Sequence, residues 1–140
     1  MDAVTLVIDG SALGNPGPGG WAALLRTEGR ERLLAGASAE PTTNNRMELM
    51  AVLEGLRALR RPCPVVVVTD SEYVRGALAL GWKRRANHDL LTEIDALLRV
   101  HTVTFEVVRG HAGHPDNERV DRAAKAEAEK AKSALAVAGR

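Results

Sequence analysis

Two hydrophobic runs in this chain end abruptly in an aspartate. Residues 4–8 are apolar apart from one threonine and are followed by Asp9, and residues 65–69 form a valine-rich run followed by Asp70. Short runs of this kind are typical of strands that are covered on both faces of a sheet. If the two strands lie side by side and parallel, Asp9 and Asp70 meet at one sheet edge, where open α/β sheets place their ligands.

Three further segments have the pattern of strands. Residues 21–26 and 30–35 predict a hairpin joined through residues 27–29, and residues 102–108 are rich in β-branched residues. Residues 14–20, mostly glycine and proline, can form neither a strand nor a helix, so the chain turns there. Because a hairpin pairs antiparallel, the first three strands form one side of a mixed sheet.

Helical spacing of apolar residues begins after the hairpin. Residues 41–45 supply cap-forming side chains and an apolar stripe continues over residues 46–60, which predicts a helix packed on the sheet. Further patterns predict three more helices, over residues 71–78, over residues 89–99 and from about residue 116 onward. Beyond about residue 131 the pattern weakens and we expect fraying. The order of elements predicts an α/β fold in a single domain, residues 1–140.

Composition narrows the class of protein. With 140 residues and 45% hydrophobic content, the chain suits one domain with one core. The formal charge of +1 gives no overall signal for nucleic acid or membrane, so either partner must be recognised by local patches. Cys63, the only cysteine, allows no internal disulfide and fits a reducing compartment. No leader pattern and no apolar run of roughly 18 residues is present, so we expect a soluble, cytoplasmic protein with no membrane partner.

Four acids are candidates for one pocket. Glu48 lies at the margin of the apolar stripe of its predicted helix, and Asp121 lies in the second turn of the last helix. Clustered carboxylates repel one another, so a pocket that also holds Asp9 and Asp70 is useful mainly when divalent cations fill it. All-oxygen ligands select Mg²⁺ or Mn²⁺, and two such ions about 4 Å apart suit phosphodiester hydrolysis. The alternative is that these acids are surface residues, and that Glu48 is a solvated first-turn glutamate stabilised by the helix dipole.

Taken together, the motifs resemble those of type 1 ribonuclease H. The matching blocks are residues 9–11 with 14–17, residues 43–49, residues 69–71, and residues 110–115 continued by 117–119 and Asp121. The resemblance extends from residue 4 to about residue 126. It implies the ribonuclease H-like fold, a mixed five-stranded sheet with three antiparallel strands first and helices on both faces, which agrees with the strand order predicted above.

The resemblance also implies an activity. The family consists of endonucleases that hydrolyse the RNA strand of RNA–DNA hybrids with two Mg²⁺ ions, or Mn²⁺ in their place, leaving 5′-phosphate and 3′-hydroxyl ends. The residues that match its metal ligands are Asp9, Glu48, Asp70 and Asp121. His111 matches the mobile catalytic histidine, which handles protons near neutral pH. The alternative for His111 and His114 is ordinary loop polarity, which we favour for His114 because the family motif places the catalytic role on the first histidine. We expect the protein to be a monomer.

Substrate contacts are implied by the same resemblance. Asn15, Asn44 and Asn45 match amides that meet the hybrid, and Thr43 with Asn87 matches a pocket for a phosphate of the DNA strand. Thr43 and Asn44 are alternatively helix caps, a role that is compatible with substrate contact. Glu72 stands where the family pattern has an amide, so it is not assigned to the site.

The largest departure from the family lies between residues 80 and 89, where well-known bacterial members carry a longer basic helix and loop. Here it is reduced to Trp82 followed by the cations Lys83, Arg84 and Arg85. We expect these residues to contact the DNA strand by stacking and counterion release, with weaker hybrid affinity than in members that have the full protrusion. The alternative is that Trp82 anchors the core and the cations form a solvated turn.

Two other functions are compatible with such a fold. One is another nuclease or a strand transferase of the same superfamily, and the other is a hybrid-binding module without catalysis. The blocks at residues 43–49 and 110–114 resemble ribonuclease H rather than transposases or proofreading exonucleases. The presence of all four acids and of His111 favours an enzyme.

Overall fold

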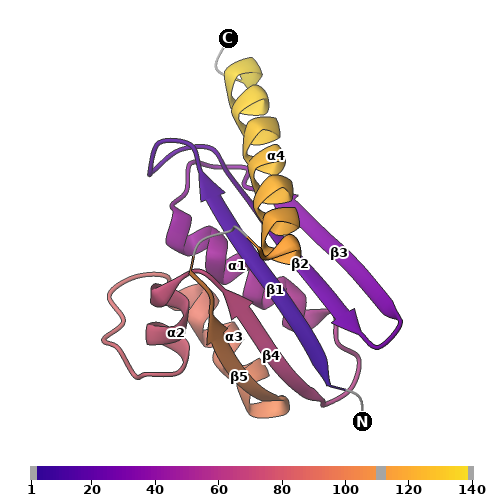
Figure 1. The fold of residues 1–140 in the computed structure, drawn as a ribbon. Coiled ribbons are helices and arrows are strands. Elements are labelled where there is room, and N and C mark those ends of the chain that lie inside the picture. The colour runs from indigo at the N-terminus through magenta and orange to yellow at the C-terminus, as the bar shows by residue number, and fades with distance from the viewer. Residues whose placement is uncertain (1–2, 110–112, 139–140) are drawn as a thin grey trace.

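The structure is a computed structural model that describes residues 3–109 and 113–138. Five strands form one sheet in the order β3-β2-β1-β4-β5 (Figure 1). They are β1 (Val4–Ala12), β2 (Gly19–Thr27), β3 (Arg30–Ala37), β4 (Pro64–Thr69) and β5 (Thr102–Val107). β1, β2 and β3 pair antiparallel, whereas β4 is parallel to both β1 and β5, which confirms the predicted mixed sheet.

The central position of β1 follows from its sequence. Leu6 and Ile8 pack in the core on one face of the sheet and Val7 packs in the core on the other, so the run is apolar without alternation. In the parallel pair Val7 lies opposite Val68, and both strands therefore continue towards the same edge. This register confirms the pairing on which the convergence of the two aspartates depends.

Helices cover both faces of the sheet (Figure 1). α1 (Asn44–Arg57), α2 (Glu72–Leu78) and α3 (His88–Val100) lie on one face and form the larger core with β1, β2 and β4. α4 (Pro115–Ala138) lies on the other face, where Val120 and Ala124 pack with Val7 and Leu24. Among the described residues, no helix has both the length and the apolar character that crossing a membrane requires.

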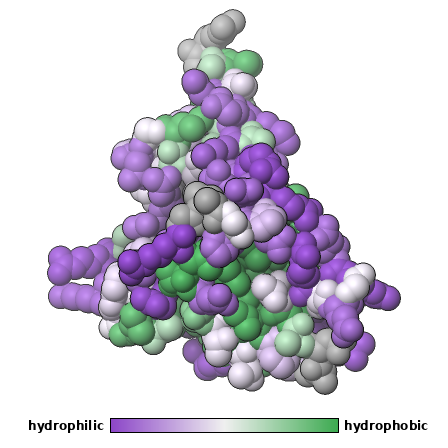
Figure 2. Space-filling view, in the orientation of Figure 1, coloured by the Kyte–Doolittle hydropathy of each residue, from purple (hydrophilic) through white to green (hydrophobic). Residues whose placement is uncertain are grey.

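α4 crosses the sheet at close range and then extends past it (Figure 1). Gly20 of β2 allows this approach, because a Cβ atom there would lie 2.4 Å from the carbonyl oxygen of Ala124. Ala131 is the last buried residue of the helix. The sequence predicts fraying beyond about residue 131, whereas the helix continues to Ala138, because alanine and lysine are strong helix formers. Figure 2 shows hydrophobic residues beside α4, where the helix leaves part of this face uncovered.

The start of α1 differs from the predicted helix over residues 46–60. Thr43 is the N-cap, and its side-chain oxygen accepts a hydrogen bond of 3.1 Å from the backbone N–H of Arg46. The helix therefore begins at Asn44, two residues before the apolar stripe, and it ends at Arg57. The capping alternative for Thr43 is confirmed.

Candidate active site

The acidic side chains come from different elements that meet at the edge of the sheet. Asp9 lies in β1, Asp70 directly follows β4, and Glu48 lies in the second turn of α1. Gly10 lets α1 approach β1 closely, because a Cβ atom at Gly10 would lie 2.4 Å from the backbone nitrogen of Glu48. The glycine that follows Asp9 is therefore a condition for bringing Glu48 beside it.

Three carboxylates form a tight group at this point. One oxygen each from Asp9, Glu48 and Asp70 lies within 4.8 Å of the others, a spacing that could hold a metal ion. Asp9 and Glu48 are each only 6% exposed, so the alternative that Glu48 is a solvated surface residue is wrong. The Oε2 atom of Glu48 is buried without a hydrogen-bond partner among the described residues. A cation would satisfy this oxygen, and so the residues present fit a divalent metal.

The protein alone stabilises the charged form of this group poorly. Burial, with the charge of Asp70, raises the pKa of Asp9 from 3.8 to about 6. Burial also raises the pKa of the Glu48 carboxyl group well above its ordinary value, and the neighbouring charge of Asp9 acts in the same direction. Without a cation the pair therefore retains a proton at pH values where isolated carboxyl groups have lost it. Perturbed carboxyl groups of this kind are typical of functional sites.

Asp121 is the fourth acid, and it enters from α4 on the other face of the sheet. Its interaction with Asp9 contributes to the raised pKa of Asp9. Its Oδ2 atom accepts a hydrogen bond of 3.0 Å from Nζ of Lys125, one helical turn later. Lys125 was not among the residues predicted from the sequence, although the spacing of four residues from Asp121 is the signal for an ion pair on a helix.

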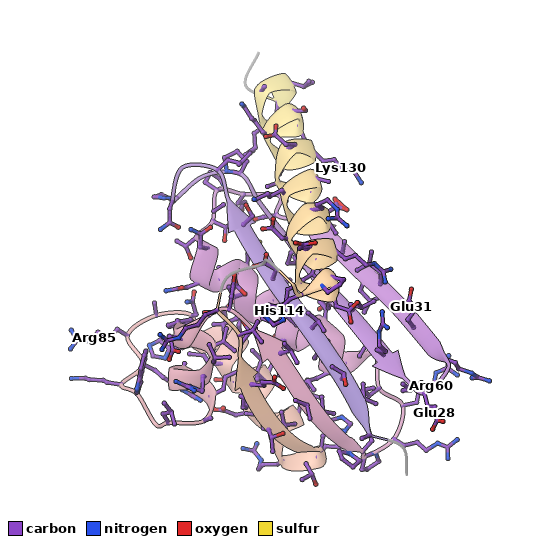
Figure 3. The ribbon with its side chains drawn as sticks, in the orientation of Figure 1. Glu28, Glu31, Arg60, Arg85, His114 and Lys130 are labelled. Carbon is purple, nitrogen blue, oxygen red and sulfur yellow. The ribbon has the colours of Figure 1, made fainter. Side chains whose placement is uncertain are left out.

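The two histidines are not equally described. His111, the predicted catalytic histidine, lies outside the described residues. His114 is half-buried and lies directly before α4 (Figure 3), and its carbonyl oxygen accepts a hydrogen bond of 3.0 Å from the backbone N–H of Glu118. His114 therefore contributes to the first turn of α4 through its backbone.

Two of the predicted substrate amides tie the turn after β1 to the start of α1. The side-chain oxygen of Asn15 accepts a hydrogen bond of 2.9 Å from the backbone N–H of Asn44. The side-chain oxygen of Asn44 in turn accepts a hydrogen bond of 2.7 Å from the backbone N–H of Ala12. Asn44 thus bonds to β1 instead of capping its own helix, and both amides are held in place before any substrate is present.

A second group of predicted contacts meets between α1 and α3. The Asn87 amide donates to the Tyr73 hydroxyl at 3.2 Å and accepts from Nη1 of Arg46 at 3.3 Å. Arg46 also forms a bidentate pair with Asp89, with distances of 2.9 and 2.6 Å, and these bonds lower the pKa of Asp89 to about 2. No role was predicted for Arg46 from the sequence, although it lies inside the motif at residues 43–49.

A cavity of about 220 Å³ brings several of these residues together. Its lining includes Asn45, Tyr73, Trp82 and Asn87. Glu72 begins α2, directly before Tyr73, but its side chain pairs with Arg75 at 2.7 Å. This pairing agrees with leaving Glu72 out of the candidate site.

Comparisons with known proteins give a consistent result. Residues 1–129 match the family described as RNase H. Ribonuclease H from Nitratidesulfovibrio vulgaris (strain DP4) is 52% identical to this chain, over 89% of this chain and 88% of its own length. The N-terminal RNase H domain of a Mycobacterium tuberculosis protein has a TM-score of 0.83 at 24% identity, covering 96% of this chain and 99% of that one. LC11-RNase H1, solved in complex with RNA/DNA hybrid, has a TM-score of 0.75 at 20% identity, with coverages of 91% and 98%. The solved structures confirm the predicted fold.

Proposed function

This chain belongs to the ribonuclease H family and is a nuclease, and we propose that it hydrolyses the RNA strand of RNA–DNA hybrids with two Mg²⁺ ions. Mn²⁺ would serve as a substitute. The products would carry 5′-phosphate and 3′-hydroxyl ends. The observation that carries this proposal is the group formed by the buried Asp9 and Glu48 and the partly buried Asp70, one oxygen of each lying within 4.8 Å of the others.

The acids would hold the metal, and Asp121 would complete their set from the opposite face of the sheet. The bound metal would supply an activated water and stabilise the charge on the leaving oxygen. Asp9 and Glu48 would hold the metal in a fixed position, because both are buried where α1 packs on β1. His111, which we assign to proton handling on the resemblance alone, would act from the segment before α4.

The hybrid is the substrate that the surrounding polar residues support best. LC11-RNase H1, which shares this fold, was solved with an RNA/DNA hybrid. In this chain the amides of Asn15, Asn44 and Asn45 stand at the start of α1, next to the turn that carries Glu48, and they would contact the minor groove where 2′-hydroxyls mark the RNA strand. Thr43 and Asn87 would bind a phosphate of the DNA strand.

A hybrid-binding module without catalysis is the second candidate. Such a protein would have no use for a buried carboxylate oxygen without a partner, because an unsatisfied group of this kind costs stability. Among the residues that the structure describes, the Oε2 atom of Glu48 is such an oxygen. The protein keeps this unfavourable buried oxygen, which favours an enzyme over a binding module.

One RNA sequence presented in four forms tests the proposal. The labelled strand would be paired with DNA, paired with RNA or left single, and the all-DNA duplex of the same sequence would be the fourth substrate, each with Mg²⁺ and with excess EDTA. We expect cleavage of the RNA strand in the hybrid alone, dependent on Mg²⁺, with 5′-phosphates that a phosphatase can remove. Equal cleavage of duplex RNA would identify a different nuclease, and binding without cleavage would identify a binding module.

We also propose that the enzyme is a monomer and that it is located in the cytoplasm. Cys63 is a free cysteine, as a reducing compartment favours. Size-exclusion chromatography at the concentration of the cleavage assay tests the monomer, and a dimeric mass there would exclude it.

A further inference from the structure

The loop between α2 and α3 is the part of the chain that departs most from the family pattern. It protrudes from the body of the protein (Figure 1) and carries three successive cations, Lys83, Arg84 and Arg85. From the sequence alone, all three residues are predicted to have the same role, contact with nucleic acid. The structure distinguishes them, because the middle cation is directed into the protein.

Arg84 uses all three guanidinium nitrogens within the protein. Its Nη1 and Nη2 atoms pair with the two carboxylate oxygens of Asp95 on α3 at 2.5 and 2.8 Å. Its Nε and Nη2 atoms also donate to the carbonyl oxygen of Ala77 near the end of α2, at 3.3 and 3.0 Å. The pairing lowers the pKa of the Asp95 carboxyl group. Arg84 therefore joins the loop to α2 and α3 and has little capacity left for a phosphate.

The neighbouring cations differ from Arg84. Lys83 and Arg85 are exposed, and neither forms an ion pair with any other described residue. Arg85 points away from the body of the protein into solvent (Figure 3). These two side chains are therefore available to a polyanion, whereas Arg84 is not.

Trp82 is held by α2 and is nevertheless accessible. Its backbone N–H donates to the carbonyl oxygen of Gly76 at 3.0 Å, and its indole ring packs on Gly76, where a Cβ atom would lie 2.1 Å from the ring. The residue remains 48% exposed. Gly81, with φ of 71°, makes the turn that directs the ring back onto α2. The structure thus combines the two interpretations of Trp82, since the ring is anchored on one side and exposed elsewhere.

We propose that Arg84 is a positioning residue which, through Asp95 and the carbonyl of Ala77, fixes the loop so that Trp82, Lys83 and Arg85 are pre-arranged to grip the nucleic acid. The proposal rests on the proposed function, since the grip is meant for the RNA–DNA hybrid. A long basic protrusion gains affinity from many contacts. A short protrusion gains affinity when its side chains are already held in place, because the entropy of immobilising them is then not lost on binding.

The proposal predicts different signatures for neighbouring cations. Arg84→Ala should loosen the loop and raise KM about 3- to 10-fold, the expected effect of immobilising one or two side chains on binding, with kcat within about twofold of the parent. The slope of log KM against log salt should not change. Lys83→Ala and Arg85→Ala should each reduce that slope by about one unit, because each removes a phosphate contact.

Order in the loop can be measured without nucleic acid. Trp21 and Trp82 are the two tryptophans of the chain, so Trp21→Phe leaves Trp82 as the only reporter. In that background, Arg84→Ala and Asp95→Asn should increase quenching of Trp82 fluorescence by acrylamide. Glu93→Gln is the matched control, because Glu93 also lies on α3 but pairs with Arg57 of α1, away from the loop. Arg84→Lys, which keeps the charge without the planar fork, should restore little of the order.

The outcomes separate this proposal from the function on which it rests. Increased quenching together with a higher KM and an unchanged salt slope supports it. A reduced salt slope with unchanged quenching in Arg84→Ala would overturn it and make Arg84 a phosphate contact. Increased quenching with unchanged KM would also overturn the proposal, because a fixed loop would then make no contribution to hybrid binding. If the parent neither bound nor cleaved the hybrid, the proposed function itself would fail, although the quenching experiment would still show whether Arg84 fixes the loop. Thermal unfolding of each variant would confirm that it is folded.

Discussion

The buried acids should make the metal-free protein less stable as the pH rises. Asp9 is the clearest case, because burial and the charge of Asp70 raise its pKa from 3.8 to about 6. Between these values the folded protein holds more protons than the unfolded chain. The stabilisation is therefore complete below about pH 4 and is lost as the pH rises through about 6. Glu48, whose pKa is raised well above its ordinary value by burial and by Asp9, adds a loss of the same sign.

The size of the effect follows from the two pKa values of Asp9. The difference between 3.8 and about 6 corresponds to roughly 3 kcal/mol in the free energy of unfolding. For a chain of this length, 3 kcal/mol lowers Tm by roughly 10 °C. Mg²⁺ should reverse the loss, since a ligand that binds only the folded state contributes about 2.7 kcal/mol at one hundred times its Kd.

Thermal unfolding followed by circular dichroism between pH 4 and 8, with EDTA and then with Mg²⁺, measures this directly. Asp9→Asn removes the titrating group, so its Tm should depend much less on pH than that of the parent. Glu28→Gln is the control, because Glu28 is an exposed residue in the β2–β3 turn (Figure 3) and its replacement should leave the parental pH dependence intact. A parental Tm that stays constant or rises from pH 5 to 8 without metal would refute the reasoning, as would equal pH dependence in Asp9→Asn.

Two further predictions concern the histidines before α4 and the lysine that pairs with Asp121. His111→Ala should lower the cleavage rate about 10²-fold or more and leave hybrid binding nearly intact, because it removes a proton carrier. His114→Ala should have the smaller effect. Equal losses of rate for the two variants in single-turnover assays would contradict the different roles predicted for the two histidines. Lys125→Ala should tighten Mn²⁺ binding about two- to fivefold, measured by electron paramagnetic resonance of free Mn²⁺, because the Lys125 ammonium group competes for the Asp121 carboxylate at 3.0 Å. Lys130→Ala, which breaks an ion pair with Glu127 on the same helix, should leave Mn²⁺ affinity unchanged, and weaker binding in Lys125→Ala would disprove the competition.

The sheet and the two aspartates could be predicted from the sequence because their signals are local. The runs that became β1 and β4 are apolar on both faces and end in acids, and parallel pairing brings Asp9 and Asp70 to one edge. Glu48 was harder to place, since a residue at the margin of a helical stripe can face either solvent or a pocket. The close approach of α1 to β1 at Gly10 decides this, and hydrophobic periodicity does not report that approach.

The charged residues show where the sequence is insufficient. Lys83, Arg84 and Arg85 are alike in sequence, and only the position of Asp95 on α3 shows that the middle cation is paired within the protein. Lys125 is one of many cations in a helix rich in lysine and glutamate, so its pairing with a functional acid depends on where α4 crosses the sheet. His111 lies outside the described residues, and its role remains a prediction from the family resemblance.

Cleavage of one RNA–DNA hybrid, labelled on both strands, by the parent protein and by Asp70→Asn would give the clearest answer. In Mg²⁺ the parent should cut the RNA strand and leave the DNA strand intact, and it should cut neither strand in excess EDTA. Asp70→Asn keeps the size of the side chain and removes one ligand charge, so the variant should fold and bind the hybrid but lose at least about 10²-fold in single-turnover rate. Cleavage of RNA by Asp70→Asn at the parental rate, or full parental activity in EDTA, would show that the acidic group is not the catalytic site.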